Sequence, residues 1–309
     1  MKRPHALDRD AGAAHLQSPR GIRDVAARSI AAAHRAPALQ RCWVVEEHAL
    51  FLEVAEVGTF TLMWTRTDAP GASGFLPGEG VLADTAEPDV LALAAGFLLT
   101  EGMIDGIGDV AEMAVCPDAP DVLRVRLKGP ARVRTNRRGG LVASACGVCG
   151  SVDRANQPAD GLAAVPDSLR LSAFDLQQMM AAMESRQFIF NTTGGTHAAA
   201  LFSAQCEMIA SAEDLGRHNA LDKVIGRCLL RRQATAGCGV ALSSRVSLEM
   251  IVKAARAGIE LVAAVSAPTS LAIDTAQRLG ITLCGFVRSG RMTAFTHPHR
   301  ITASANPAR

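Results

Sequence analysis

The stretch VALSSRVSLEMIVKAARAGIELVAAVSAPTSLAIDTAQRLGITLCGFV, residues 240–287, decides the fold class. Its apolar runs predict three short strands, and the two segments between them have the periodicity of amphipathic helices, each closed by a glycine. Two successive β-α-β units need right-handed crossovers and give a parallel sheet covered by helices. The sequence therefore predicts an α/β fold.

Polar and small residues follow each of the three predicted strands. In open α/β sheets, ligands bind beyond the carboxyl ends of the strands, and hydroxyls, free helix N–H groups and arginines suit phosphate oxygens. Helix capping alone would account for the second strand end, but the coincidence at three ends favours a phosphate-bearing ligand. The three ends are Ser243-Ser244-Arg245, Ser266-Ala267-Pro268-Thr269-Ser270 and Phe286-Val287-Arg288-Ser289-Gly290-Arg291.

The residues before this stretch contain a second polar group, at 213–223. Asp214 suits a helix N-cap, and Asp222 with Lys223 suits solvated surface charge. Local rules do not account for Arg217-His218-Asn219 together, which favours a functional cluster at the start of a helix over 217–230. Further upstream, Ser172 with Asp175 predicts another helix start, 188–190 a strand, and 197–210 a hairpin.

The N-terminal half is predicted to be smaller and rich in strands. Residues 42–63 and 122–127 have strand patterns, a Gly/Pro-rich insertion that looks like a loop spans 68–87, and a helix follows Pro88. We expect residues 1–41, which lack apolar periodicity, to be a disordered tail. The predicted organisation is this tail, an N-terminal part over 42–155, and an α/β ligand-binding part over 168–303.

The pair Cys146-Gly147-Val148-Cys149 is the sharpest chemical feature. Two thiols at this spacing suit sulfur relay, dithiol redox chemistry or half of a zinc site, and the arginines that precede them favour the thiolate. A structural zinc site needs two more ligands, and His197 and His218 are the available candidates. A zinc deaminase would need a proline before the pair and an upstream His-x-Glu, and neither is present.

Composition narrows the class of protein further. Of 309 residues, 49% are apolar and 20% charged, which fits a folded chain. No apolar run is long enough for a membrane span, and no signal peptide is visible, so we expect a cytoplasmic protein with reduced cysteines. Residues 1–41 have eight basic and three acidic side chains within a total charge of +2, so the body of the protein is not basic and needs no nucleic-acid partner.

The chain resembles the FdhD family of formate dehydrogenase accessory sulfurtransferases. The motifs that carry the resemblance are spread from about residue 46 to residue 301. They are Cys146-Gly147-Val148-Cys149-Gly150, Thr193-Gly194-Gly195-Thr196-His197, the run from Glu213 to Lys223, Ser243-Ser244-Arg245, Ser266-Ala267-Pro268-Thr269-Ser270 and Thr296-His297-Pro298.

The resemblance implies a sulfurtransferase. Such a protein accepts persulfide sulfur from a cysteine desulfurase and passes it to the molybdenum cofactor, in its bis-molybdopterin guanine dinucleotide form, for formate dehydrogenase. Cys146 corresponds to the persulfide-bearing residue, with Cys149 assisting. The cofactor-binding segment corresponds to Phe286, Val287, Arg288, Ser289, Gly290 and Arg291.

The resemblance also implies a cytidine deaminase-like three-layer sandwich without a structural metal, and a homodimer. From a different class, the same motifs allow a non-catalytic chaperone that binds the molybdenum cofactor without covalent sulfur chemistry.

Overall fold

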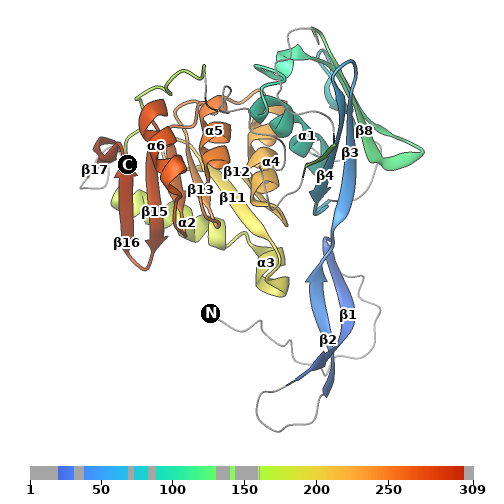
Figure 1. The fold of residues 1–309 in the computed structure, drawn as a ribbon, viewed down its shortest axis with the longest axis horizontal. Helices are drawn as coiled ribbons and strands as arrows, with labels where there is room; N and C mark the ends of the chain where they lie inside the picture. Colours follow the sequence, from blue (N-terminus) through green and yellow to red (C-terminus); the bar gives the residue numbers. More distant parts are fainter. Residues whose placement is uncertain are drawn as a thin grey trace.

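The computed structural model describes residues 20–30, 38–68, 73–82, 88–129, 140–142, 159 and 161–302. A six-stranded sheet forms the C-terminal part (Figure 1), and its three central strands are parallel, as the alternation over 240–287 predicts. The outer pairs are antiparallel. In spatial order the strands are β12 (Met208–Asp214), β11 (His197–Phe202), β13 (Gly239–Leu242), β14 (Leu261–Ala264), β15 (Thr282–Arg288) and β16 (Arg291–Thr296).

Helices cover both faces of this sheet, which makes three layers (Figure 1). Alternate residues of β11 point to opposite sides, so Ala199 and Leu201 pack in one apolar cluster, whereas Ala200 and Phe202 pack in the other. The α/β prediction is confirmed. One face is covered by α2 (Ala173–Glu184), and the other by α4 (Arg217–Leu230), α5 (Leu248–Arg256) and α6 (Ser270–Leu279).

The start of α2 follows from local sequence alone. The Ser172 hydroxyl accepts a hydrogen bond from the Asp175 backbone N–H at 3.1 Å, and the Asp175 carboxylate accepts one from the Ser172 N–H at 2.8 Å. Two backbone donors that the first turn would leave free are thereby satisfied. The predicted helix start is confirmed.

The N-terminal part is a seven-stranded mixed sheet whose apolar face packs on helix α1 (Asp89–Thr100). All twelve residues of α1 are buried, because the helix lies between this sheet and α4 (Figure 1). In spatial order the strands are β6 (Gly80–Leu82), β5 (Gly74–Leu76), β7 (Val110–Cys116), β8 (Ala119–Leu127), β3 (His48–Val54), β4 (Gly58–Trp64) and β9 (Gly140–Val142).

Two glycines allow α1 and α4 to pack with their backbones in contact. A Cβ atom on Gly96 would overlap the carbonyl oxygen of Asp222, and one on Gly226 would overlap the carbonyl oxygen of Ala92. Apolar residues of both sheets and of both helices then belong to one continuous cluster. The N-terminal and C-terminal parts therefore share a core.

The expectation that residues 1–41 are a disordered tail is wrong over 22–29 and 38–41. Strand β1 (Ile22–Ser29) pairs antiparallel with β2 (Ala38–Val45), and this ribbon projects from the body of the protein (Figure 1). Backbone pairing holds the ribbon, and most of its side chains are partly or fully exposed. A strand with no buried face has no apolar alternation, so the sequence pattern missed it.

Two further expectations are corrected. Part of the inserted segment forms β5 and β6, a hairpin that extends the N-terminal sheet by pairing with β7. Residues 188–190 are not a strand but the start of the short helix α3 (Phe188–Thr193). The Glu213 carboxylate accepts hydrogen bonds from the backbone N–H groups of Ile189 and Phe190, both at 2.8 Å, and so caps a helix that local propensity does not favour.

Short elements complete the described chain. Strands β10 (Leu171–Ser172) and β17 (Ile301–Thr302) pair in parallel, and two 3₁₀ turns are η1 (Ile107–Asp109) and η3 (Pro298–Arg300). Among the helices that the structure describes, none is both long and apolar enough to cross a bilayer.

Candidate functional site

The predicted cofactor-binding residues form the turn between β15 and β16. Ser289 and Gly290 connect the strands with φ angles of 51° and 74°, the left-handed values that a tight hairpin turn requires. Val287 is buried, whereas Phe286 is 40% exposed, with its ring centroid 6.3 Å from that of Phe295. The aromatic face and the two arginines of this hairpin, Arg288 and Arg291, lie at the carboxyl end of β15.

The strand ends that the sequence analysis grouped do lie side by side. Leu242 at the end of β13 pairs with Ala264 of β14, and Ala263 pairs with Cys284 of β15. The Phe286 N–H donates to the Ser266 carbonyl oxygen at 3.3 Å, which ties the hairpin to the end of β14. The capping interpretation is confirmed for Thr269, whose hydroxyl accepts from the Ala272 N–H at 3.3 Å.

Most of the polar run 213–223 is buried and structural. The Nζ atom of Lys223 lies 3.0 Å from the Asp214 carboxylate and 3.2 Å from that of Asp89, and it donates to the Thr65 carbonyl oxygen at 2.7 Å. Burial alone would lower the pKa of Lys223, but the carboxylates of Asp89 and Asp214 outweigh it and raise the pKa. Burial opposes ionisation of Asp89 as well, yet Lys223 and Arg227 hold its pKa down at about 2.

A second buried pair joins α4 to α5 and α1. Lys253 lies 2.9 Å from the Asp222 carboxylate and donates to the Thr100 hydroxyl at 2.7 Å, and that hydroxyl donates to Asp222 at 2.8 Å. The interpretation of Asp222 and Lys223 as surface charge is therefore wrong, since both are almost completely buried. Sequence reasoning missed Asp89 and Lys253, because they meet their partners only in the folded chain.

Asn219 is also structural. Its side-chain amide donates to the Met63 carbonyl oxygen at 2.7 Å and to the Asp214 carboxylate at 2.9 Å. Asn219 thus links the two sheets and has a structural role, although the sequence predicted it to belong to a functional cluster with Arg217 and His218. The other two, Arg217 and His218, lie in the first turn of α4 and face a different set of neighbours.

Those neighbours form a cationic group, His197, Arg217, His218 and Arg245, which we call the edge cluster. His197 begins β11 opposite Asp214, Arg217 and His218 begin α4, and Arg245 follows β13. Burial lowers the pKa of His197, and the positive charges of Arg217, His218 and Arg245 lower it further. The cluster therefore lies at the carboxyl end of β13, on the same edge of the sheet as the β15–β16 hairpin.

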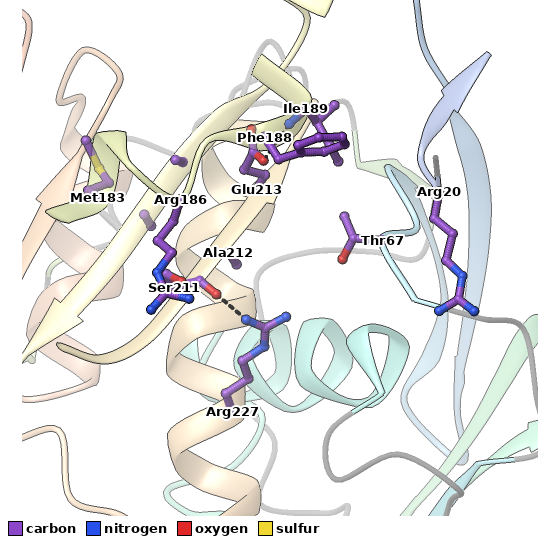
Figure 2. A pocket seen from close by; sticks show the side chains of 12 residues that line it. Arg20, Thr67, Met183, Arg186, Phe188, Ile189, Ser211, Ala212, Glu213 and Arg227 are labelled. Atoms are coloured by element: carbon purple, nitrogen blue, oxygen red, sulfur yellow. Dashed lines mark hydrogen bonds between the residues drawn. The ribbon is translucent and has the colours of Figure 1, made fainter. Parts of the chain in front are cut away.

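A cavity of about 390 Å³ opens on another side of the molecule, between α3, α4 and the start of the ribbon (Figure 2). Arg20, Arg186 and Arg227 line it together with Phe188 and Glu213. Arg227 is already paired, because its guanidinium donates to the Ser211 carbonyl oxygen and lies 2.6 Å from Asp89. None of the predicted site residues that the structure describes, Phe286 to Arg291, lines this cavity.

Cys146 and Cys149 lie outside the described residues, as do the arginines at 132–138, so their roles stay predictions. Within the ranges that the structure covers, no group of three or more His, Cys, Asp or Glu side chains could hold a metal ion. The six cysteines of those ranges, Cys42, Cys116, Cys206, Cys228, Cys238 and Cys284, are all free thiols.

Comparison with known proteins identifies the family. Residues 85–302 match the FdhD/NarQ family. The sulfur carrier protein FdhD of Bordetella bronchiseptica is 41% identical over 215 residues, which are 68% of this chain and 77% of that protein. The sulfur carrier protein FdhD of Thermoplasma acidophilum is 38% identical over 243 residues, 76% of this chain and 83% of that protein.

A solved structure shares the fold. It is assigned as a formate dehydrogenase accessory protein from Desulfotalea psychrophila and superposes with a TM-score of 0.66 at 21% identity, over 90% of this chain and 99% of that one. The sheets and the helices that cover them define an α/β protein. The chain belongs to the FdhD/NarQ family.

Proposed function

We propose that this protein is a sulfurtransferase that accepts persulfide sulfur from a cysteine desulfurase on Cys146 and transfers it to the molybdenum cofactor used by formate dehydrogenase. The observation that carries the proposal is the family match, which spans residues 85–302 and includes the Cys146-Gly147-Val148-Cys149 motif. The names of the relatives, sulfur carrier proteins, support the same chemistry.

The geometry of the sheet edge supports a nucleotide-bearing acceptor. The β15–β16 hairpin offers Phe286, partly exposed for contact with a base, beside two arginines for phosphate oxygens. We propose that Phe286 to Arg291 bind the guanine dinucleotide of the acceptor. The three-layer arrangement supports the further proposal that the fold is of the cytidine deaminase-like type.

Sulfur loading is a thiol exchange. The Cys146 thiolate attacks the outer sulfur of the desulfurase persulfide, the S–S bond of the donor breaks, and the donor cysteine leaves as a thiolate. The outer sulfur then resides on Cys146 as a persulfide. For release as sulfide, the Cys149 thiolate attacks the inner sulfur and forms a Cys146–Cys149 disulfide, which a cellular dithiol afterwards reduces.

Intact-protein mass measured without reductant tests loading. The chain is incubated with a cysteine desulfurase and free cysteine, alongside Cys146→Ala and the control Cys116→Ala, which removes a partly exposed thiol of the described part. We expect increments of whole sulfur atoms, reversed by reductant, in the wild type and Cys116→Ala only. No increment, with the desulfurase proven on another acceptor, would refute the proposal and favour the non-catalytic cofactor chaperone.

The partners of this proposal are a cytoplasmic desulfurase, formate dehydrogenase and a second copy of the chain. Cys146→Ala should abolish formate dehydrogenase maturation in cells while nucleotide binding by the purified protein stays unchanged. Maturation that persists in this variant would remove Cys146 from the reaction.

A further inference from the structure

The edge cluster lies where two long helices begin. Arg217 and His218 occupy the first turn of the 14-residue helix α4, and Ser247 is the N-cap residue of the nine-residue helix α5. Because Ala199 pairs with Leu242, the last residue of β13, His197 lies beyond the end of that strand, beside the loop that carries Arg245. The positive ends of two helix dipoles thus add to the side-chain charges.

The carboxylates around the cluster leave its two arginines unpaired within the described part of the chain. Asp214, which faces His197 across the β11–β12 pair, is bound to Lys223, Asn219 and the Gly216 N–H. Glu249 lies 3.0 Å from His218. Arg217 and Arg245 form no ion pair with any residue in the described part of the chain.

Buried polar atoms at the same place lack partners. The Nε atom of Arg217 and the hydroxyl of Ser247 are shielded from solvent and donate or accept no hydrogen bond within the described ranges, whereas the Nε2 atom of His218 lies 3.0 Å from the Glu249 carboxylate. His218 is only 8% exposed. Leaving buried polar groups unsatisfied destabilises the folded chain, so native proteins keep few of them without a reason.

We propose that His197, Arg217, His218 and Arg245 form an anion-binding subsite for a phosphate-type oxyanion, separate from the β15–β16 hairpin. Two arginines, two imidazole rings, two helix N-termini and a hydroxyl are groups that bind phosphate oxygens in proteins. The structural role found for Asn219, Asp222 and Lys223 leaves Arg217 as the member of the motif that is available to a ligand, beside His218 and its partner Glu249.

The distance between the proposed anion subsite and the β15–β16 hairpin restricts the size and charge of the natural ligand. β11 and β15 are separated by three strand intervals of ~4.8 Å, so the subsite lies roughly 14 Å across the sheet edge from the hairpin. One phosphate group cannot contact both. A ligand that does so is extended and carries anionic groups along its length, as a pyrophosphate-linked dinucleotide does; this identification of the ligand rests on the proposed function.

Titration calorimetry with inorganic pyrophosphate and the full chain tests the subsite. We expect Arg217→Gln and Arg245→Gln each to weaken binding about tenfold or more, since a charge-assisted contact is lost. Arg170→Gln, which removes an exposed arginine paired with Asp167, should leave binding unchanged. Circular dichroism and Trp fluorescence like those of the wild type show that each variant is folded.

Two results would overturn the proposal: no pyrophosphate binding by the wild type, or equal affinity in the wild type and both subsite variants. Mass measurement separates this outcome from failure of the proposed function. If Arg217→Gln loses pyrophosphate binding while the wild type takes no sulfur on Cys146, the subsite stands and the sulfurtransferase does not. If sulfur loads normally on Cys146 of the wild type and Arg217→Gln binds pyrophosphate as tightly as the wild type, the sulfurtransferase stands and the subsite does not.

Discussion

Replacing Lys223 by methionine should cost this protein a large part of its stability. The ammonium group of Lys223 lies within 3.2 Å of two carboxylates, on Asp89 and Asp214, that are 1% and 0% exposed. Methionine fills a similar volume but leaves both carboxylates with less compensation, because Asp89 then keeps Arg227 as its one cationic partner in the described part of the chain, besides hydrogen bonds from Thr67. Removing one partner from a buried ion pair costs about 3–5 kcal/mol.

The effect is measurable in guanidinium chloride. With a dependence of about 5 kcal/mol per molar, a loss of about 4 kcal/mol moves the unfolding midpoint down by about 0.8 M. Trp fluorescence follows the transition at the right place, because the Lys223 Nζ atom lies 5.1 Å from the ring of the buried Trp64. The control Lys128→Met removes an exposed lysine and should shift the midpoint by less than about 0.1 M.

A double variant tests the cause. If unpaired charge is responsible, Lys223→Met with Asp214→Asn should recover part of the loss, because one of the two uncompensated carboxylates is then neutral. A shift below about 0.2 M for Lys223→Met alone would mean that water reaches these carboxylates, and the argument from burial would fail.

Three further predictions concern pH, packing and the edge cluster. The pKa of Asp89 is about 2 in the folded protein and about 3.8 in the unfolded chain, so its charge contributes about 2 kcal/mol of stability above pH 5, and this contribution is lost as the pH falls towards 2. When the free energy of unfolding is measured by denaturation between pH 5 and pH 2, Asp89→Asn should therefore lose less stability than the wild type. An equal loss in both proteins would contradict the assignment. Gly226→Ala should lower the free energy of unfolding by about 1–3 kcal/mol, since overlap with the Ala92 carbonyl outweighs a helix-propensity gain of about 1 kcal/mol; a raised unfolding midpoint would refute the close packing. The pKa of the His197 ring, measured by NMR with the signal assigned through His197→Gln, should lie below 6.5 in the free protein. Added sulfate should raise this pKa, because a bound anion offsets the positive charge of the arginines. An unchanged pKa would count against the edge cluster as an anion site.

Sequence predicted the elements whose cause is local. The alternation over 240–287 and the Ser172–Asp175 capping box depend on neighbours within a few residues, and the structure confirms both. Prediction from the sequence failed where a residue far away along the chain determines the local structure. Phe188 begins a helix because Glu213 caps it, and no pattern within 188–190 carries that information.

The polar run 213–223 shows the same limit for the site. Charged residues at a helix start are usually solvated, so the sequence favoured surface charge for Asp222 and Lys223. Their partners, Lys253 and Asp89, stand 31 and 134 residues away along the chain, and only the folded structure brings them together. The edge cluster was divided among three motifs for the same reason, since β11, α4 and the loop after β13 meet only in space.

The enclosure of α1 has a consequence for synthesis on the ribosome. Helix α1 is completed at Thr100, but α4, the surface that covers it, begins only at Arg217. At a translation rate of about 10 residues per second, the nascent chain carries an uncovered apolar helix for about 10 seconds. The N-terminal part therefore cannot finish folding as it emerges, and a cell that produces this protein must protect that helix from aggregation until the C-terminal part has been made.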